Sequence, residues 1–446
     1  MFKKIVIANR GDVAIRVQRA CREMGIKTVA VHSTADSSAM NVRLADESVC
    51  IGPPTSRDSY LNIPAILSAA SISGADAIHP GVGFLSENPA FAQIVSDHGL
   101  TFIGPKPEHI KVMGDKIEAK KMALELGIPC VPGSDGAIRT KDEALLVAKD
   151  VGFPIIVKAA AGGGGKGMQI AFSETELSNA IKLAQSEAEA SFGSGEVYIE
   201  RYLANPRHIE IQIIGDKFGN VVHLGERDCS LQRRHQKILE ETPSPALTKK
   251  VRNDIGALAA TAMQKFGYES LGTIEFLYEN GEFYFIEMNT RLQVEHPITE
   301  MVTGIDLVQK QIQISAGEPL GISQDDVSLK GHSIECRINA EDPENFIPSP
   351  GKIADYHPPG GFGIRIDSGI YAGYEIPPHY DSLIAKLIVH GQNREQCLSR
   401  LQRALDEFVI GNIKTTIALH QKLLSTKNFI DGEYDIHWLE KHLLKQ

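Results

Sequence analysis

The sequence predicts a multidomain protein of mixed α/β and α+β class, and three observations support this class. The chain has 446 residues, 42% of them hydrophobic and 23% charged, which is enough for two or three packed cores. Residues 1–114 alternate strand and helix patterns, as in a doubly wound parallel sheet. Residues 204–330 instead carry an alternating strand and two further strands joined by an Asn-Gly hairpin signal.

The first region is predicted to contain five elements: strand 4–8, helix 12–24, and strands 28–32, 77–79 and 101–103. Asn9-Arg10-Gly11-Asp12 has one glycine where a dinucleotide fingerprint needs three, so we assign no NAD site. Residues 79–84 (HPGVGF) follow a strand end, where ligands often bind in such sheets. A plain turn is the alternative.

Arg16, Arg19 and Glu23 are spaced i, i+3 and i+7 on the predicted helix 12–24, which places them on one face. A charged stripe of this kind is most often a solvated surface. We therefore expect these three side chains to face water unless a partner covers them.

A glycine-rich loop distinguishes the second region. Helix 116–126 is followed by strand 154–158, the loop AAAGGGGKGM and a strand from residue 168. Consecutive glycines expose N–H groups that suit phosphate oxygens. The loop is not a Walker A motif, because Gly167 stands where Ser or Thr is required. A flexible linker is the alternative, but the flanking strands favour a β-hairpin flap, and residues 196–200 form another strand.

A cluster of cations lies in residues 227–237 (RDCSLQRRHQK), which we expect to form a loop after the alternating strand 208–213. In an acidic protein, a local basic cluster suggests an anionic ligand. A solvated surface loop is the alternative. Cys229 could also be a nucleophile activated by His235, but no third group that would orient the histidine is apparent.

Two glutamates interrupt the apolar strands 273–278 and 283–288, which Asn280-Gly281 joins. A buried ionised carboxylate is costly unless it is paired or binds a metal. We therefore expect Glu275 and Glu287 either to pair with cations or to bind a metal. Asn289 lies on the same strand face as Glu287, and three oxygen ligands of this kind suit Mg²⁺. Two salt-bridged glutamates are the alternative.

The register of this hairpin decides whether the glutamates can meet. A strict two-residue turn would put Glu275 opposite Ile286, with the two glutamates on opposite faces. We therefore predict an odd-length loop with Gly281 in the left-handed conformation, which brings both to one face. The segment after the hairpin, residues 291–296, adds a cation, an amide and another carboxylate beside the metal site.

The last region, residues 331–446, is predicted to begin with strand 332–339, which carries Glu335 and Arg337, and to end with helices 394–407 and 413–424. No repeats or low-complexity linkers separate it from the rest of the chain. We therefore expect one compact multidomain body.

Charge and composition exclude several classes. The net charge of −10 argues against nucleic-acid binding, and no run of about 18 apolar residues predicts a membrane span. The start, MFKKIVIANRGD, lacks a signal-peptide cleavage site. Six cysteines without CxxC spacing give no zinc pattern and fit reduced thiols, so we expect a cytoplasmic protein.

Eight segments in order along the chain carry a family resemblance: IANRGDVAIRV, HPGVGFLSEN, MGDKIEAK, the loop 158–168, RDCSLQRRHQKILEE, EFYFIEMNTRLQVEH, ECRINAEDP and YDSLIAKL. Together they resemble biotin carboxylases, which are ATP-grasp enzymes and components of acetyl-CoA carboxylases in fatty acid synthesis. No motif position departs from the family pattern, and the resemblance covers essentially the whole chain.

The resemblance implies an ATP-grasp fold in three parts. These are a Rossmann-like N-terminal domain (1–114), an ATP-grasp domain (115–330) with a mobile lid at about 131–203, and a C-terminal biotin carboxylase domain (331–446). It also implies a homodimer with Arg16, Arg19 and Glu23 at the interface.

The implied reaction is phosphorylation of bicarbonate by ATP to carboxyphosphate, which then carboxylates N1′ of biotin. By this resemblance ATP is held by Lys116, Lys158, Gly162, Gly163, Gly164, Gly165, Glu200, Leu203, His208, Gln232 and His235. Two Mg²⁺ or Mn²⁺ ions are held by Glu275, Glu287 and Asn289. Bicarbonate is held by Lys237, Arg291, Gln293 and Val294. Glu295 is the implied base, and Arg337 stabilises the biotin enolate.

The resemblance also bears on partners. No Ala-Met-Lys-Met biotin-attachment motif occurs, so we expect biotin on a separate carrier protein and transfer by separate carboxyltransferase subunits. The same half-reaction would serve a pyruvate or propionyl-CoA carboxylase. Another ATP-grasp carboxylate-amine ligase and a non-catalytic nucleotide-binding subunit are the remaining alternatives. The first would turn over without biotin, and the second would lack a metal ligand or the base.

Overall fold

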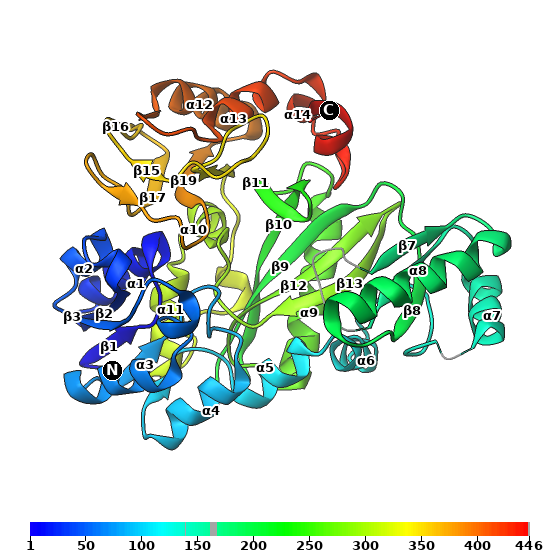
Figure 1. Ribbon diagram of the computed structural model, residues 1–446, viewed down its shortest axis with the longest axis horizontal. Helices are drawn as coiled ribbons and strands as arrows, with labels where there is room; N and C mark the ends of the chain where they lie inside the picture. Colours follow the sequence, from blue (N-terminus) through cyan, green and yellow to red (C-terminus); the bar gives the residue numbers. More distant parts are fainter. Residues whose placement is uncertain (139, 161–166, 445–446) are drawn as a thin grey trace.

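The computed structural model describes residues 1–138, 140–160 and 167–444. Figure 1 shows an N-terminal region beside a long central sheet, a lobe that projects to the right, and a C-terminal region at the top, above the N-terminal region and the sheet. Among the described residues, no helix combines the length and apolarity that crossing a bilayer requires.

The N-terminal region is a five-stranded parallel sheet in the order β3-β2-β1-β4-β5, which confirms the doubly wound prediction. Both faces of β1 are buried: Ile5 and Ile7 pack with α1, whereas Val6 packs with α3 and α4. The strands are β1 (Lys4–Ile7), β2 (Lys27–Ser33), β3 (Glu47–Gly52), β4 (Ala77–His79) and β5 (Thr101–Phe102). The helices are α1 (Gly11–Glu23), α2 (Met40–Leu44), α3 (Ile63–Ser73), α4 (Pro89–Asp97) and α5 (Pro107–Gly114).

The projecting lobe is a small antiparallel sheet, β7-β6-β8, covered by two helices. Its apolar core joins the three strands to α7 and α8. The predicted flap hairpin is confirmed, because β6 pairs with β7 from Ile155 to Lys158. Gly162, Gly163, Gly164 and Gly165 lie outside the described residues. The elements are α6 (Lys116–Glu125), which precedes the lobe, α7 (Lys141–Val151), β6 (Ile155–Ala159), β7 (Met168–Ala171), α8 (Glu174–Phe192) and β8 (Val197–Arg201).

The central sheet has eight antiparallel strands in the order β13-β12-β9-β10-β11-β14-β19-β17. It passes without a break from residues before 330 to residues after 331, because β11 pairs with β14. The strands are β9 (Arg207–Gly215), β10 (Val221–Arg233), β11 (Gln236–Thr242), β12 (Ser270–Glu279), β13 (Glu282–Asn289), β14 (His332–Asn339), β17 (Ile364–Ser368) and β19 (Leu383–Gly391). The helices between them are α9 (Lys249–Phe266), α10 (His296–Thr303) and α11 (Leu307–Ser315).

Strand β9 shows why the middle of the sheet has one apolar face and one polar face. Its isoleucines Ile209, Ile211 and Ile213 are fully buried in a core shared with α9. The alternating residues Glu210 and Gln212 point to the other face by the period of a strand. This face carries the charged network described below.

The C-terminal region packs α12 against β14 and β19 in a separate core. Its remaining elements are β15 (Gly351–Lys352), β16 (Tyr356–His357), β18 (Glu375–Ile376), α12 (Arg394–Glu407), β20 (Val409–Ile410), α13 (Ile417–Leu424) and α14 (Lys427–Asp431). Short 3-10 or π-helical turns lie at Thr34–Asp36, Ser56–Asp58, Gln324–Asp326 and Leu439–Leu443.

Two predicted elements differ from the structure. The cation cluster at 227–237 is not a loop but the end of β10 and the start of β11, joined by Arg234 and His235 with φ of 48° and 63°. The helix predicted at 413–424 begins at Ile417, because Thr416 is hydrogen bonded to β14. Its backbone N–H donates to Asn339, and its hydroxyl accepts from the Asn339 N–H at 2.9 Å.

The charged stripe predicted to face water on α1 is partly buried in the structure, because Arg16 is only 6% exposed. Its guanidinium lies 2.7 Å from both Glu300 and Asp306, so it ties α1 to the segment around α10 and α11. Arg19 and Glu23 contact Asp367 and Gln309 near the surface. The expectation of a solvated stripe is therefore wrong for Arg16.

We predict that Arg16→Ala lowers the free energy of unfolding by about 3 kcal/mol, because it breaks a buried ion pair and leaves two carboxylates short of a cation. Arg403→Ala is the control: Arg403 is 49% exposed and pairs with Glu407 on the surface of α12, so its loss should change stability by less than about 1 kcal/mol. Urea unfolding followed by circular dichroism measures both, and equal effects would contradict the assignment.

Candidate active site

The hairpin of β12 and β13 has a two-residue turn, so the predicted odd-length loop is wrong. Glu279 pairs with Glu282, and Asn280 and Gly281 between them both have positive φ, as in a type I′ turn. A β-bulge corrects the register instead. Phe276 faces Phe285, but Glu275 faces Glu287, which leaves Ile286 as the extra residue.

The two glutamates therefore lie directly opposite each other, as their proposed role requires. Burial first, and then repulsion from the charge of Glu275, raises the pKa of Glu287. Asn289 donates from Nδ2 to Glu275 at 2.9 Å, so the amide completes the group. A divalent cation between these oxygens would remove the repulsion, and the donor set fits Mg²⁺ or Mn²⁺.

Glu275 is held ionised by its neighbours. Burial by itself would raise its pKa, but Lys237 and His208 outweigh burial and bring the pKa below its ordinary value. Lys237 donates to its Oε1 at 2.9 Å, and His208 Nε2 lies 2.8 Å from its Oε2. Gln232 in turn contacts Nδ1 of His208 at 2.8 Å, so two of the residues assigned to the nucleotide pocket meet.

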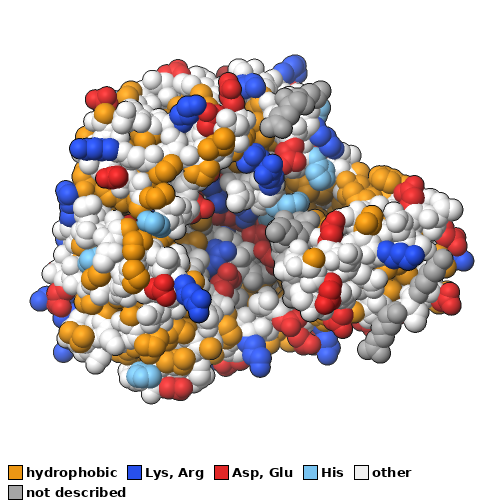
Figure 2. All heavy atoms as spheres, viewed as in Figure 1, with side chains coloured by type: hydrophobic (Ala, Val, Ile, Leu, Met, Phe, Trp, Pro, Cys, Tyr) orange, Lys and Arg blue, Asp and Glu red, His pale blue; other side chains and the backbone are white. Residues whose placement is uncertain are grey.

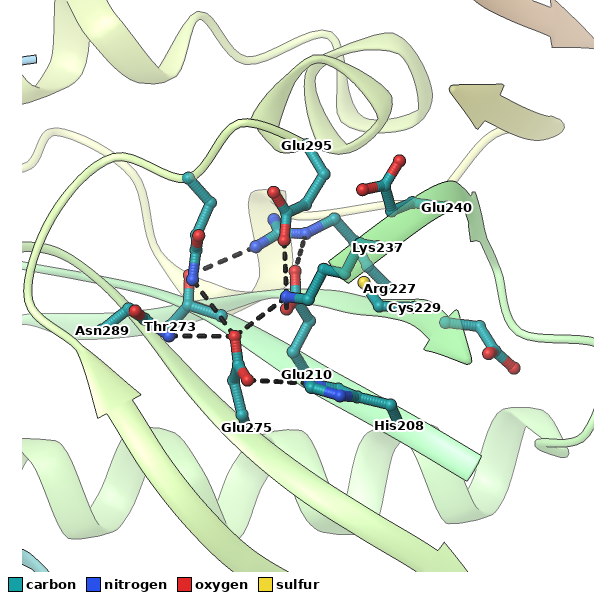
Figure 3. A network of polar contacts seen from close by, with 12 residues as sticks. His208, Glu210, Arg227, Cys229, Lys237, Glu240, Thr273, Glu275, Asn289 and Glu295 are labelled. Carbon is teal, nitrogen blue, oxygen red and sulfur yellow. Dashed lines mark hydrogen bonds and ion pairs between the residues drawn. The ribbon is translucent and has the colours of Figure 1, made fainter. Parts of the chain in front are cut away.

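Lys237 is the hub of the site (Figure 3). Its ammonium group donates to Glu210 at 2.6 Å, to Glu275 at 2.9 Å and to Glu295 at 2.7 Å. Burial opposes the charge of this lysine, but the surrounding anions raise its pKa well above the ordinary value. All three donors of the ammonium group are thus used by carboxylates from β9, β12 and the segment before α10.

Behind this hub lies Arg227, whose side chain is 0% exposed. Its Nε donates to Glu210, and its Nη atoms donate to Gln212 at 2.7 Å and to Thr273 at 3.2 Å. Every one of these partners lies on the polar face of the central sheet. Arg227 therefore supplies fixed positive charge that no ligand can reach.

Glu295 joins the hub to Arg337. It accepts from Lys237 through Oε1 and from Arg337 Nη2 through Oε2 at 3.0 Å. Burial would raise its pKa, but Lys237 and Arg337 hold the pKa well below the ordinary range. Arg337 also donates from Nε to Glu240 at 2.6 Å. A carboxylate thus bridges two cations that come from β11 and β14.

The segment 290–295 carries Arg291, which Glu87 from the N-terminal region holds. Arg291 donates from Nε to Glu87 at 2.8 Å and from its Nη atoms to Asn289 at 2.8 Å and Gln293 at 2.9 Å. Glu87 also accepts from the backbone N–H of Thr290 at 3.1 Å. The predicted strand-end motif at 79–84 thus leads directly into a contact with this segment.

The lobe contributes a second group of predicted residues. Glu200 on β8 accepts from Lys158 on β6 at 2.6 Å and from Lys120 on α6 at 2.7 Å. Leu203 packs with Val131 and Tyr284. Figure 2 shows the molecule hollowed between this lobe and the remaining regions, with charged and histidine side chains along the hollow.

Not every predicted residue joins these contacts. Lys116 is exposed at the start of α6, and its positive charge acts to lower the pKa of Glu287. His235 is exposed at the turn between β10 and β11. Val294 takes part through its backbone carbonyl, which accepts from Lys386 at 2.9 Å.

Comparison with known proteins places this arrangement in a family. Three family models match: "Biotin carboxylase, N-terminal domain" over residues 1–110, "Carbamoyl-phosphate synthase L chain, ATP binding domain" over 115–323, and "Biotin carboxylase C-terminal domain" over 335–441. The biotin carboxylase of Haemophilus influenzae is 57% identical over 99% of both chains. The chain belongs to the biotin carboxylase family.

Solved structures agree with this membership. A biotin carboxylase β,γ-ATP complex from Campylobacter jejuni superposes with a TM-score of 0.94, at 50% identity over 99% of both chains. The biotin carboxylase domain dimer of a Hydrogenobacter thermophilus 2-oxoglutarate carboxylase, with MgADP, ADP and bicarbonate, has a TM-score of 0.92 at 50% identity, covering 99% of this chain and 98% of that one. The fold is that of an ATP-grasp biotin carboxylase, an ATP-dependent carboxylase.

Sequence reasoning gave no individual role to several buried charged residues of this site, among them Glu210, Arg227, Glu240 and Lys386. One signal was available, because Glu210 lies two residues from His208 in an alternating strand and so shares its face. The partners of these charges come from strands that are distant in the sequence. Their pairing could not be predicted from spacing.

Cys229 does not fit the alternative in which it acts as a nucleophile. Its thiol is fully buried among the charged side chains of the site. Burial, and then the charge of Glu210, raises its pKa well above the ordinary value. Since the thiolate is the reactive form, this thiol is inert.

We predict that iodoacetamide labels the exposed Cys50 of the native protein and leaves Cys229 unlabelled. Mass spectrometry of peptides from the native and the urea-unfolded protein measures both sites. Unfolding should make the two thiols equally reactive, which controls for digestion and detection. Native labelling of Cys229 as fast as that of Cys50 would contradict its inert state.

Proposed function

We propose that this biotin carboxylase carries out the first half-reaction of an acetyl-CoA carboxylase in fatty acid synthesis. ATP would phosphorylate bicarbonate, releasing ADP, and the resulting carboxyphosphate would transfer its carboxyl group to N1′ of biotin with release of phosphate. The observation that carries the proposal is Glu295, whose two oxygens contact Lys237 and Arg337. One carboxylate thus links an anion-binding cation to a second cation suited to biotin.

Bicarbonate is a weak nucleophile and needs a base. We propose that Lys237, Arg291, Gln293 and the backbone of Val294 bind it and that Glu295 removes its proton. Lys237 and Arg337 hold Glu295 ionised, so it is ready to accept a proton. When bicarbonate also binds Lys237, the ion pair between Lys237 and Glu295 would weaken. The pKa of Glu295 would then rise toward its ordinary value, which makes Glu295 a stronger base.

Biotin would bind beside Arg337. Its ureido nitrogen is a poor acid, so loss of the N1′ proton places negative charge on the ureido oxygen, and a cation must lie next to that oxygen. Arg337 is permanently charged and planar, which suits this task better than a lysine. Its contacts with Glu240 and Glu295 hold it in one orientation.

ATP would lie between the lobe and the central sheet, held by Lys116, Lys158, Glu200, Leu203, His208, Gln232 and His235, with Gly162, Gly163, Gly164 and Gly165 over the phosphates. Phosphoryl transfer depends mainly on positioning and charge neutralisation. Two Mg²⁺ or Mn²⁺ ions at Glu275, Glu287 and Asn289 would supply part of that neutralisation. Because Lys158 is bonded to Glu200, it must exchange this partner for a phosphate.

We also propose the wider assembly that the family implies. The chain would divide into domains 1–114, 115–330 (lid at about 131–203) and 331–446, and would form a homodimer like the dimer of the Hydrogenobacter domain. Arg16, Arg19 and Glu23 on α1 would lie at this interface, and Arg19 and Glu23 are the exposed members of the three. A separate carrier would bring biotin, and carboxyltransferase subunits would accept the product.

A cytoplasmic location is part of the same proposal, and six free cysteines support it. A different carboxylase remains a candidate for the complex that this chain serves. The Hydrogenobacter relative belongs to a 2-oxoglutarate carboxylase, and a pyruvate or propionyl-CoA carboxylase would use the same half-reaction. The acyl or oxo-acid acceptor is chosen by another subunit.

We predict that free biotin stimulates ADP release from Mg-ATP and bicarbonate, and that Arg337→Ala reduces this stimulation at least about 100-fold, as expected when a cation that faces developing charge is lost. A coupled ADP assay measures both. Arg403→Ala, which removes an exposed arginine from α12, is the control and should keep the wild-type rate. Turnover indifferent to biotin would point to the amine-ligase alternative.

We predict that Glu87→Gln raises the KM for bicarbonate about tenfold and leaves the KM for ATP unchanged, because one hydrogen-bonded charge that positions Arg291 is lost. Steady-state ADP release at varied bicarbonate measures the change. Glu269→Gln is matched, because it breaks a 2.7 Å ion pair with Lys106 that does not involve Arg291. Equal effects of the two variants would show a general loosening of the N-terminal region rather than positioning.

A further inference from the structure

Two buried carboxyl groups behind Arg337 have no assigned role. Glu240 on β11 and Glu335 on β14 pair directly across the two strands, so their side chains lie on one face. Both residues are 0% exposed. Like charges placed directly opposite in a sheet are destabilising, and burial removes these two from the screening effect of bulk solvent.

Most of their oxygens have no partner among the described residues. Glu240 uses only Oε1, which accepts from Arg337 at 2.6 Å, whereas its Oε2 and both oxygens of Glu335 make no hydrogen bond. Lys386, the cation whose charge acts most strongly on Glu335, is engaged by the Val294 carbonyl at 2.9 Å and by Asp12 at 3.2 Å. An ionised carboxylate in such a place costs more than a neutral one.

Charged and titratable groups from several neighbouring elements surround this pair. They are Lys237 on β11, Arg337 on β14, Lys386 on β19, Arg365 and Asp367 on β17, Glu295 before α10, His296 on α10 and Asp12 on α1. His296 is kept neutral, since burial lowers its pKa well below the ordinary value. Arg337 already contacts two carboxylates, Glu240 and Glu295. A third ionised carboxylate, at Glu335, would place three negative charges around the single positive charge of Arg337.

We propose that Glu335 stays protonated in the folded protein, and that this neutral acid lets Glu240 act as the positioning residue that holds Arg337 for the biotin-dependent step. The inference rests on the proposed function for the role of Arg337. A charge at Glu335 would add negative potential next to the ureido oxygen, where negative charge must develop. The proton on Glu335 removes that penalty without adding a cation.

Protonation follows the same pattern. Burial first, and then Glu240, raises the pKa of Glu335 well above the ordinary value. Burial also raises the pKa of Glu240 to about 7, although Arg337 opposes the rise. The neutral form is therefore favoured at Glu335, which has no hydrogen-bonded cation, over Glu240, which has one.

The first test measures stability and needs no activity. A carboxyl group with a raised pKa in the folded state binds more protons there than in the unfolded state, so it makes stability fall as pH rises above its unfolded pKa. Glu335→Gln removes this carboxyl group and therefore its pH-dependent contribution to the free energy of unfolding. Its thermal midpoint should exceed that of wild type by a margin that widens from about pH 6 to about pH 9. Parallel curves would overturn the protonated state.

The second test measures the biotin-dependent step. Glu335→Gln mimics a neutral acid, so the ratio of biotin-stimulated to biotin-independent ADP release should stay within about threefold of wild type, whereas Glu240→Gln should lower it about tenfold, since a hydrogen bond to a charged group is lost. Glu240→Asp, which keeps the charge, should recover part of the loss. A merely structural role would lower both rates together.

The outcomes separate the two proposals. If Glu335→Gln abolishes biotin stimulation as Glu240→Gln does, Glu335 is needed as an anion and the inference is wrong. If the wild-type protein shows no biotin stimulation, the proposed function fails, while the stability comparison still decides the protonation of Glu335.

Discussion

The balance of buried charge around Lys237 is the constraint on which the site depends. One ammonium group makes contacts of 2.6 to 2.9 Å with three carboxylates, and each of the three has a second partner. Glu210 is held by Arg227, Glu275 by Asn289 and Glu295 by Arg337. Burying this many charges is tolerable only because they pair with one another, and removing any one leaves another uncompensated.

This network needs a rigid support, and the central sheet supplies it. The isoleucines of β9 bury one face of the strand against α9, so the alternating charged residues must point to the other face. Strands β10, β11 and β14 continue that face, and α10 packs over it. Glu295, at the start of α10, thus reaches residues from both sides of the predicted domain boundary.

Much of this could be predicted from local patterns, and the rest could not. Strand and helix periodicity identified the parallel N-terminal sheet and the flap hairpin, because both depend on neighbours in sequence. The Asn-Gly hairpin itself was predicted, but its loop length was predicted wrongly, because the bulge at Ile286 that corrects the register has no local sequence signal. Arg16 looked solvated because its partner Glu300 is 284 positions away. The meeting of Lys237, Glu295 and Arg337 could be expected only through the family resemblance.

The pairing of β11 with β14 has a consequence for how far this chain can be divided. A fragment that ended near residue 330 would keep the predicted nucleotide-binding residues but would leave β11 as an exposed edge strand. Leu239, for example, would lose its cross-strand neighbour Cys336. Exposed edges of this kind invite pairing with other chains. Such a fragment would lose Arg337 and expose an aggregation-prone edge strand. The ATP-binding and C-terminal domains of the family therefore share one continuous sheet here.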